Sequence, residues 1–266
     1  MERSQLAIGV FDSGMGGLTV LRALRQHLPH ESFVYLGDTA RLPYGTKSAL
    51  TVQHYATQMT KVLVERQIKA LVIACNTATT AALPHLQSLY QDIPVIGVVE
   101  PGAIAATDVS KSGHILVLAT ETTIASRAYH EAIRAKLPEA LIDDRACSLL
   151  VALAEEGIIA HDIARLTLKH YLQDSQHDDT VLLGCTHFPV FKPLIQELLP
   201  KATIVDSATA TATALAKALA EQQLLNQGHA PKTSYLVTDA VKRFCRIGEL
   251  FLQEPISPEN VQLIDA

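Results

Sequence analysis

The chain has 266 residues, of which 48% are apolar, and a formal net charge of -5 at pH 7. This length allows a sizeable core and is close to the size at which a second domain is expected. The sequence has no long run of Lys or Arg that could bind nucleic acid or anionic membranes, and its first apolar run is too short for a signal sequence or a membrane span. We therefore expect a cytoplasmic protein with no nucleic-acid or membrane partner.

Short apolar runs alternate with stretches of helical spacing along the chain. The apolar runs predict strands at residues 6–12, 32–38, 70–76, 93–99, 114–120, 180–185, 203–208 and 234–239. Helices are predicted between them, for example at residues 18–28 and 124–137. Unbroken apolar strands that alternate with helices are typical of parallel sheets covered on both faces. The sequence thus predicts an α/β fold, with a domain boundary within residues 97–113.

The turn FDSGMGG (residues 11–17) joins the first predicted strand to the first predicted helix. A glycine-rich turn of this kind can cradle an anion, and Asp38 follows the next strand, where dinucleotide-binding proteins carry a ribose-binding acid. Thr19 replaces the third glycine of that fingerprint, which makes dinucleotide binding the weaker interpretation. In either case the turn offers a helix N-terminus together with Asp12 and Ser13.

Two of the four cysteines occupy nearly the same setting. LVIACNT (residues 71–77) and VLLGCTH (residues 181–187) each end an apolar strand with a small residue, a cysteine and polar side chains. Ligands of doubly wound sheets bind at the carboxyl ends of the strands, and a following helix N-terminus lowers the pKa of a thiol. We therefore expect Cys75 and Cys185 to be reactive.

The other two cysteines, Cys147 and Cys245, lack comparable polar neighbours and are expected to be buried packing residues. Four widely spaced cysteines in a long chain favour reduced thiols over disulfides. A zinc site of Cys75, Cys185 and His187 would lack the usual paired spacing and a fourth ligand, so no metal is expected there. His187 is instead a candidate for proton handling. The loop LGDTARLPYG (residues 36–45) is a candidate substrate-contact loop.

Two thiols on opposite walls of one cleft suit the inversion of a carbon stereocentre. One group removes the proton from one face as a thiolate, and the other delivers a proton to the opposite face as a thiol. Helix N-termini and Thr, Asn and Ser side chains could meet the charge of the intermediate, and a closed cleft would exclude water.

Five segments together resemble the cofactor-independent glutamate racemases of the aspartate/glutamate racemase superfamily: VFDSGMGGLTVLRAL, YLGDTARLPYGTKS, VIACNTATTAAL, LATETTIAS and LLGCTHFPVFKPLI. The similarity extends over about residues 6–220. It implies interconversion of L- and D-glutamate without pyridoxal phosphate or any other cofactor, which supplies D-glutamate for bacterial peptidoglycan. It also implies two doubly wound, mainly parallel-sheet α/β domains related by pseudo-symmetry, with the active site in the cleft between them. The first domain would comprise residues 1–97 plus 208–266, and the second residues 98–207.

The resemblance also implies roles for individual residues. Cys75 and Cys185 would be the two catalytic bases, supported by Asp12 and His187. By position in the motifs, Cys75 would take the proton from D-glutamate and Cys185 the proton from L-glutamate. The substrate-binding residues would be Asp12, Ser13, Tyr44, Gly45, Asn76, Thr77, Thr186 and His187.

Some positions carry less weight. Thr120 and Thr123 rank below the eight substrate-binding residues as contacts to the substrate carboxylates. Ser148 and Ala152 stand where the family usually has proline. We therefore leave Glu155, a candidate supporting acid, out of the expected site.

Several alternatives stay open. The substrate could be another amino acid such as aspartate. The size of the pocket selects the length of the substrate side chain, and the sequence does not give that size. A nicotinamide-dependent oxidoreductase is favoured only by the glycine turn and Asp38, and it leaves the two cysteines without a role. A non-catalytic ligand-binding protein would bind without exchanging protons. The assembly state is also open, with a homodimer among the options.

Overall fold

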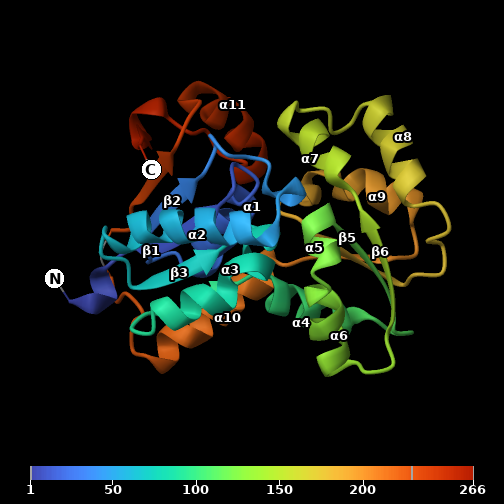
Figure 1. The fold of residues 1–266 in the computed structure, drawn as a ribbon, viewed down its shortest axis with the longest axis horizontal. Helices are drawn as coiled ribbons and strands as arrows, with labels where there is room; N and C mark the ends of the chain where they lie inside the picture. Colours follow the sequence, from blue (N-terminus) through green and yellow to red (C-terminus); the bar gives the residue numbers. More distant parts are fainter. Residues whose placement is uncertain (1, 229, 266) are drawn as a thin grey trace.

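In a computed structural model that describes residues 2–228 and 230–265, the chain forms two parallel β-sheets flanked by helices (Figure 1). The first sheet has six strands in the order β10-β9-β2-β1-β3-β4, and every neighbouring pair is parallel. These strands are β1 (Ile8–Asp12), β2 (Phe33–Gly37), β3 (Ala70–Ile73), β4 (Val95–Gly97), β9 (Thr233–Val237) and β10 (Val261–Leu263). All residues of β1 and β3 are buried, which explains why these strands read as unbroken apolar runs.

The second sheet has four parallel strands in the order β6-β5-β7-β8. They are β5 (His114–Ala119), β6 (Leu141–Ala146), β7 (Thr180–Gly184) and β8 (Thr203–Asp206). The first four strands of the chain lie in the corresponding order β2-β1-β3-β4. Each sheet therefore contains the same arrangement, in which the third strand of the set lies beside the first, and a cysteine follows that third strand in both.

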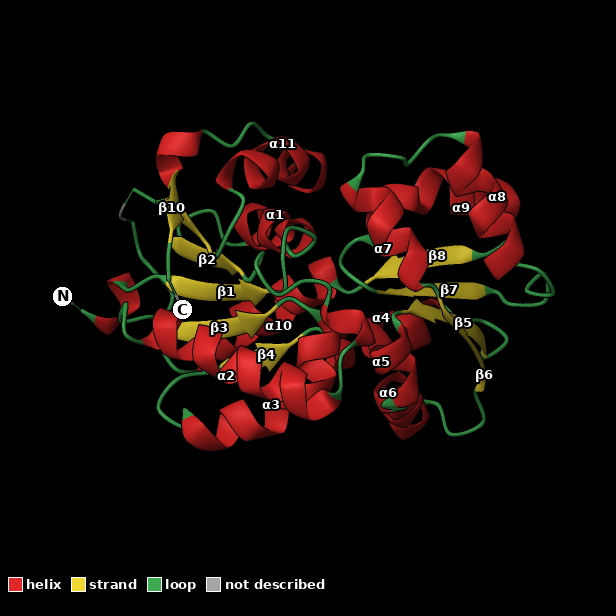
Figure 2. Cartoon of the chain, turned by 45° about the horizontal axis from the view of Figure 1, so that its top comes forward, coloured by secondary structure: helices red, strands yellow, loops and turns green. Residues whose placement is uncertain are grey.

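Helices cover both faces of both sheets (Figure 2). One face of the first sheet packs on α1 (Leu18–His27), α10 (Ala208–Glu221) and α11 (Val241–Leu252), and the other on α2 (Ala49–Val64) and α3 (Asn76–Leu89). The second sheet packs on α7 (Ser148–Glu155), α8 (Asp162–Tyr171) and α9 (Lys192–Leu198) on one face, and on α4 (Val99–Val109), α5 (Glu121–Ala125) and α6 (Ala128–Lys136) on the other. Short 3-10 helices are η1 (Arg3–Gln5), η2 (Tyr44–Thr46), η3 (Phe188–Phe191) and η4 (Pro258–Asn260). One apolar cluster runs from the α1 side of the first sheet to the α7 side of the second. The two halves of the molecule, each formed by one sheet and the helices that cover it, therefore share a core.

The structure confirms the predicted α/β fold class and differs from the predicted elements in four places, one of which is the last strand, β10, which was not predicted. The predicted helix at residues 124–137 is two helices, α5 and α6, because Arg127 adopts a left-handed conformation with φ of 60°. Strand β6 was not predicted, since its sequence LIDDRA is polar and it lies at the edge of its sheet without a fully buried residue. Most of the segment 97–113 forms helix α4, while its place as a domain boundary stays a prediction.

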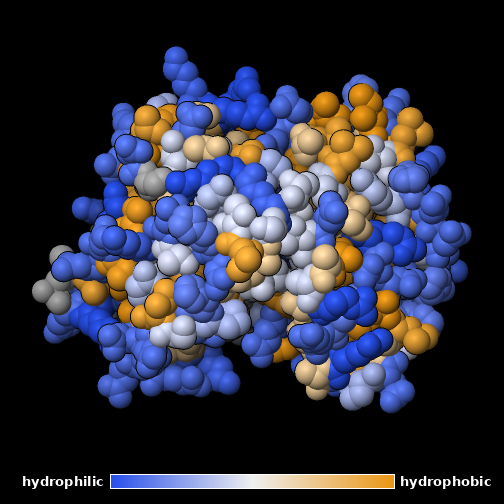
Figure 3. Space-filling view, viewed as in Figure 1, coloured by the Kyte–Doolittle hydropathy of each residue, from blue (hydrophilic) through white to orange (hydrophobic). Residues whose placement is uncertain are grey.

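The surface in Figure 3 is mostly hydrophilic, with apolar side chains gathered over α7 and α8. Leu149, Ile163 and Leu166 are exposed on these two helices. Among residues 2–228 and 230–265 no helix has both the length and the apolar composition to cross a bilayer. The assembly state stays open, with a homodimer among the options.

Candidate active site

The two matched cysteines reach the same cavity from different sheets. Cys75 follows β3 and begins α3, and Cys185 follows β7 at the corresponding position of the second sheet. Both line a cavity of about 180 Å³. They are 6% and 7% exposed, so the thiols are accessible from the cavity but shielded from bulk solvent. The volume is small compared with drug-binding pockets of roughly 300–1,000 Å³ and is suited to a small substrate.

Almost all of the predicted substrate-binding residues line this cavity with the two cysteines. They are Ser13, Tyr44, Gly45, Asn76, Thr77, Thr186 and His187. Asp12 does not line it. That carboxylate lies fully buried behind the wall, where it accepts hydrogen bonds from Gly14 N at 3.0 Å and from the Tyr35 hydroxyl at 3.4 Å. Burial raises the pKa of Asp12, and the nearby His187 partly offsets that rise.

Cys185 belongs to a chain of three side chains. Its Sγ lies 3.8 Å from Nδ1 of His187, and Nε2 of the same ring lies 3.1 Å from Glu155 Oε1. Burial by itself lowers the pKa of His187, but the interactions with Cys185 and Glu155 outweigh it and raise the pKa to about 10. The ring is therefore an imidazolium at neutral pH, beside the sulfur that it can stabilise as a thiolate.

Glu155 was left out of the expected site because the sequence around it departs from the family pattern. The structure places it in the cavity wall, in contact with His187. Helix α7 forms without either proline, with Ser148 as its first residue and Glu155 as its last.

Cys75 has a different environment. Its Sγ accepts a hydrogen bond from Ala78 N in the first turn of α3 at 3.4 Å. Burial is the largest cause and the charge of Asp12 the second in raising the pKa of this thiol to about 12. Hydrogen bonds from Ser13 and the Ala78 amide lower the pKa in part. The helix N-terminus is present as predicted, but burial outweighs its lowering effect on the pKa, so Cys75 is expected to be a protonated thiol at neutral pH.

Three buried hydroxyl groups meet beside Cys75. Thr77 Oγ1 lies 2.8 Å from Thr120 Oγ1 and 3.2 Å from Thr123 Oγ1, and the last two are 3.0 Å apart. Thr77 belongs to α3 of the first half, whereas Thr120 caps α5 of the second half and Thr123 lies within that helix. This cluster joins the halves at the cavity and provides donors for a carboxylate.

The glycine turn brings the two halves close together. A Cβ atom added at Gly16 would lie 2.4 Å from His187 Nδ1 and 2.6 Å from Thr186 Oγ1. Thr19 Oγ1 also donates to the Thr186 backbone oxygen at 3.2 Å. This part of the turn therefore packs against the second half, beside Cys185.

Asp38 does not face the cavity. It is fully buried and accepts hydrogen bonds from the Tyr44 hydroxyl at 2.5 Å and from Thr238 Oγ1 at 2.9 Å, with Arg41 Nη1 at 3.3 Å. The dinucleotide interpretation assigned this carboxylate to a ribose, and the structure commits it to protein groups instead. Burial raises the pKa of Tyr44, so its phenol stays a donor to Asp38.

Tyr129 is a site residue that the sequence did not indicate. Its hydroxyl donates to Asn76 Oδ1 at 2.5 Å, across the junction between the halves. Tyr129 lies in α6, and its contact depends on the turn at Arg127 that breaks the predicted helix. No local sequence signal pointed to that turn.

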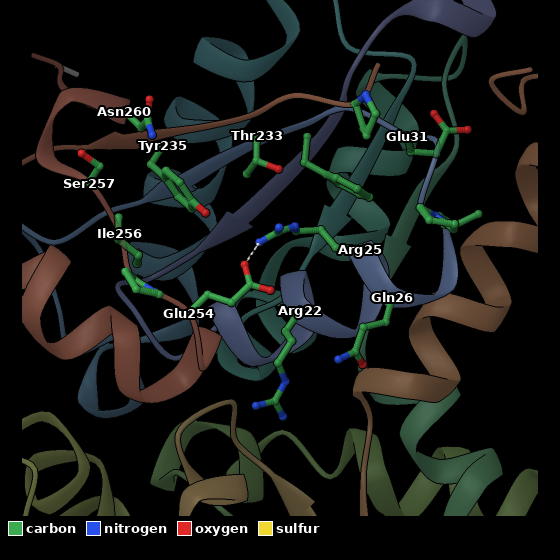
Figure 4. Close-up of a pocket in the computed structure, with 15 residues that line it drawn as sticks. Arg22, Arg25, Gln26, Glu31, Thr233, Tyr235, Glu254, Ile256, Ser257 and Asn260 are labelled. Atoms are coloured by element: carbon green, nitrogen blue, oxygen red, sulfur yellow. Dashed lines mark hydrogen bonds and ion pairs between the residues drawn. The ribbon is translucent and has the colours of Figure 1, made fainter. Parts of the chain in front are cut away.

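Other polar groupings lie away from the cysteines. A larger cavity of about 420 Å³ is lined by α1, β9 and the C-terminal segment, and two of its four charged groups, Arg25 and Glu254, are paired at 2.8 Å (Figure 4). Asp143, His177 and Asp178 place potential metal ligands within 4.8 Å of one another, next to the amino end of β7. Neither grouping includes a residue of the predicted site.

Comparison with known proteins points to the same kind of site as the geometry. Residues 18–215 match the family described as Asp/Glu/hydantoin racemase. The glutamate racemase of Syntrophus aciditrophicus is 46% identical over 261 residues, covering 96% of each chain. Glutamate racemase isoform RacE1 from Bacillus anthracis superimposes with a TM-score of 0.93 at 37% identity, covering 98% of each chain. A Francisella tularensis glutamate racemase in complex with D-glutamate gives a TM-score of 0.92 at 36% identity, again over 98% of each chain.

Two parallel α/β sheets that each bring one thiol to the same cavity, taken with these matches, define the class of a cofactor-independent racemase. The chain belongs to the Asp/Glu/hydantoin racemase family. Curated relatives that are 42–46% identical over at least 96% of the chain, and two solved structures that cover 98% of it, are glutamate racemases.

Proposed function

We propose that this protein is a glutamate racemase that interconverts L- and D-glutamate by proton transfer to and from Cys75 and Cys185, and so supplies D-glutamate for peptidoglycan. The observation that carries the proposal is the placement of the two thiols. They follow equivalent strands of two sheets that share one four-strand arrangement, and they line one small cavity. A cytoplasmic location is part of the same proposal.

The two thiols have different surroundings. Cys185 lies beside the imidazolium of His187, whereas burial raises the pKa of Cys75 and keeps it protonated at neutral pH. In the L-to-D direction, Cys185 as thiolate removes the Cα proton of L-glutamate and becomes a thiol. Cys75 then transfers its proton to the opposite face of the carbanion and becomes a thiolate. The D-to-L direction runs the same steps in reverse.

The substrate carboxylates would be bound by neutral donors. The cavity wall includes the hydroxyls of Ser13, Thr77, Thr120 and Thr186 together with the Asn76 amide. Asn76 Nδ2 is buried and has no hydrogen-bond partner among the described residues. Donors fixed by a buried network need little reorganisation when charge develops on the substrate, which favours stabilisation of the carbanion.

The division into domains is also proposed here. The first domain comprises residues 1–97 plus 208–266, and the second comprises residues 98–207. The membership of the strands supports this division, because β9 and β10 extend the first sheet and β5–β8 form the second.

The proposed reaction is tested by incubating the metal- and cofactor-free protein with L-glutamate in D2O. Loss of optical rotation together with deuterium at Cα is expected. Binding without exchange would contradict the enzyme, and a requirement for a nicotinamide nucleotide would favour an oxidoreductase. L-aspartate under the same conditions tests the alternative substrate, and we expect it to be turned over far more slowly than L-glutamate. Cys75→Ser and Cys185→Ser should each abolish racemisation without loss of the fold.

A further inference from the structure

Glu155 lies between two cationic side chains that come from different halves of the molecule. Its Oε1 is 3.1 Å from His187 Nε2, and its Oε2 is 3.9 Å from Arg243 Nη2. The same Arg243 nitrogen donates to the Glu155 backbone oxygen at 3.2 Å and to Glu156 Oε1 at 2.9 Å. The guanidinium thus holds the C-terminal end of α7 through both its main chain and its side chains.

Arg243 belongs to α11, which packs on α1 over the first sheet, whereas α7 covers the second. The two helices stand on opposite sides of the junction between the halves (Figures 1 and 2). Helix α11 makes a second contact with the same chain of groups, since the ring of Phe251 lies edge-on to His187 with ring centroids 5.1 Å apart. Two residues of α11 therefore fix the orientation of His187, one by direct packing and one through Glu155.

We propose that Arg243 is a positioning residue for Cys185, acting through Glu155 and His187. The inference rests on the proposed racemase function. The two carboxylate oxygens of Glu155 have different partners: Oε2 faces the guanidinium of Arg243, and Oε1 accepts a hydrogen bond from the imidazolium of His187. A His187 ring held in this way keeps Nδ1 directed at Sγ of Cys185.

The effect should be confined to one of the two thiols. Cys75 is held by Ala78 of α3 and by Ser13 of the turn after β1, and these groups belong to the same half as α11 but not to the chain that ends at Cys185. Loss of Arg243 therefore slows the proton transfer at Cys185 more than the transfer at Cys75. A general loosening of the fold would slow both.

Reaction rates alone do not distinguish these cases. The two enantiomers have equal free energies, so kcat/KM must be the same in both directions for every variant. Primary deuterium isotope effects do distinguish them, because each reports how far one proton transfer limits the rate. When the step at Cys185 becomes slower, the isotope effect rises with the 2-deuterated enantiomer whose proton Cys185 removes, and it falls with the other enantiomer.

The experiment measures kcat/KM and both isotope effects for wild type, Arg243→Met and Glu155→Gln, with Arg246→Met as the control. Arg246 is exposed on the same helix, so this control removes one positive charge without touching α7. Arg243→Met is expected to lower kcat/KM roughly tenfold or more. Its two isotope effects should move apart in the same sense as in Glu155→Gln, while Arg246→Met matches wild type. Arg243→Lys, which keeps the charge, should recover part of the rate.

Isotope effects in Arg243→Met that keep the wild-type ratio, or that move in the opposite sense to Glu155→Gln, would overturn the proposal. Glu156→Gln weakens the same anchor at an exposed position and should give a smaller shift of the same sense, so the test stands even if Arg243→Met does not fold. If the wild-type protein does not racemise glutamate, the proposed function has failed before any variant is compared.

Discussion

The phenol of Tyr129 donates a hydrogen bond to Asn76 Oδ1 at 2.5 Å, and this bond joins a helix of the second half to the residue that follows Cys75. Both side chains are buried. Because Oδ1 is already occupied, Asn76 has only its Nδ2 to offer the cavity, and that nitrogen has no partner among residues 2–228 and 230–265. A buried donor without a partner costs free energy until a ligand satisfies it, so Asn76 is placed to bind a substrate carboxylate.

Tyr129→Phe should therefore weaken substrate binding. Without the phenol the amide is free to rotate, and we expect KM for glutamate to rise roughly tenfold, equivalent to about 1.4 kcal/mol, with a smaller change in kcat. Steady-state kinetics in both directions measure this. Tyr90→Phe removes a hydroxyl at the other end of α3 and serves as the control. A KM for Tyr129→Phe that matches the control would show that the hydrogen bond does not orient Asn76.

Removing the charge of Glu155 should lower the pKa of His187. In the wild type, interactions with Cys185 and Glu155 raise this pKa to about 10 against the effect of burial, and the ring stays protonated through neutral pH. In Glu155→Gln the imidazolium should lose its proton at lower pH. The alkaline limb of the kcat/KM profile should then move toward neutral pH, and an NMR titration of His187 should show the same shift. If the alkaline limb of the kcat/KM profile lies at the same pH in Glu155→Gln as in the wild type, Glu155 does not stabilise the imidazolium.

Gly16→Ala should disrupt the packing between the halves. The added Cβ would lie 2.4 Å from His187 Nδ1, so the ring must move away from Cys185. We expect a loss of about 1–3 kcal/mol in the free energy of unfolding, measured with urea, and a marked fall in kcat. Gly14→Ala is the matched control, because its Cβ would meet only the end of the Leu42 side chain at 3.1 Å. Equal activity in the two variants would contradict this role of the turn.

The buried ion pair between Lys69 and Glu31 should matter for stability and not for catalysis. Both side chains are almost fully buried, Lys69 also donates to the backbone oxygen of Leu224 at 2.9 Å, and Glu31 Oε1 accepts from Asn226 N at 2.9 Å. Lys69→Met leaves Glu31 buried without its cation and should cost about 3–5 kcal/mol in the free energy of unfolding. The double variant Lys69→Met/Glu31→Gln should recover part of that loss. In both proteins, kcat/KM at a temperature where they are folded should stay close to wild type.

Local pattern predicted the two thiols, and the family resemblance predicted the residues around them. Cys75 and Cys185 end apolar runs that are typical of buried parallel strands, and the carboxyl ends of such strands carry the ligand site. The edge strand β6 escaped prediction because three consecutive charged residues at its centre resemble a loop. Tyr129 escaped because its contact with Asn76 depends on a left-handed residue between two helices. The raised pKa of Cys75 could not be foreseen, since it reflects burial and the nearby Asp12, which only the packed structure shows.

The most direct test of two thiols acting on opposite faces of one carbon is the early distribution of deuterium in D2O. Racemisation of L-glutamate is stopped after a small fraction has turned over, and the Cα deuterium content of the D-glutamate formed and of the L-glutamate that remains is measured by mass spectrometry after chiral separation. The two-base account predicts one deuterium in nearly every D-glutamate and almost none in the remaining L-glutamate, because different thiols remove and deliver the proton. Deuterium appearing equally in both enantiomers from the start, or D-glutamate that retains the original proton, would show that a single base serves both faces and would contradict the account.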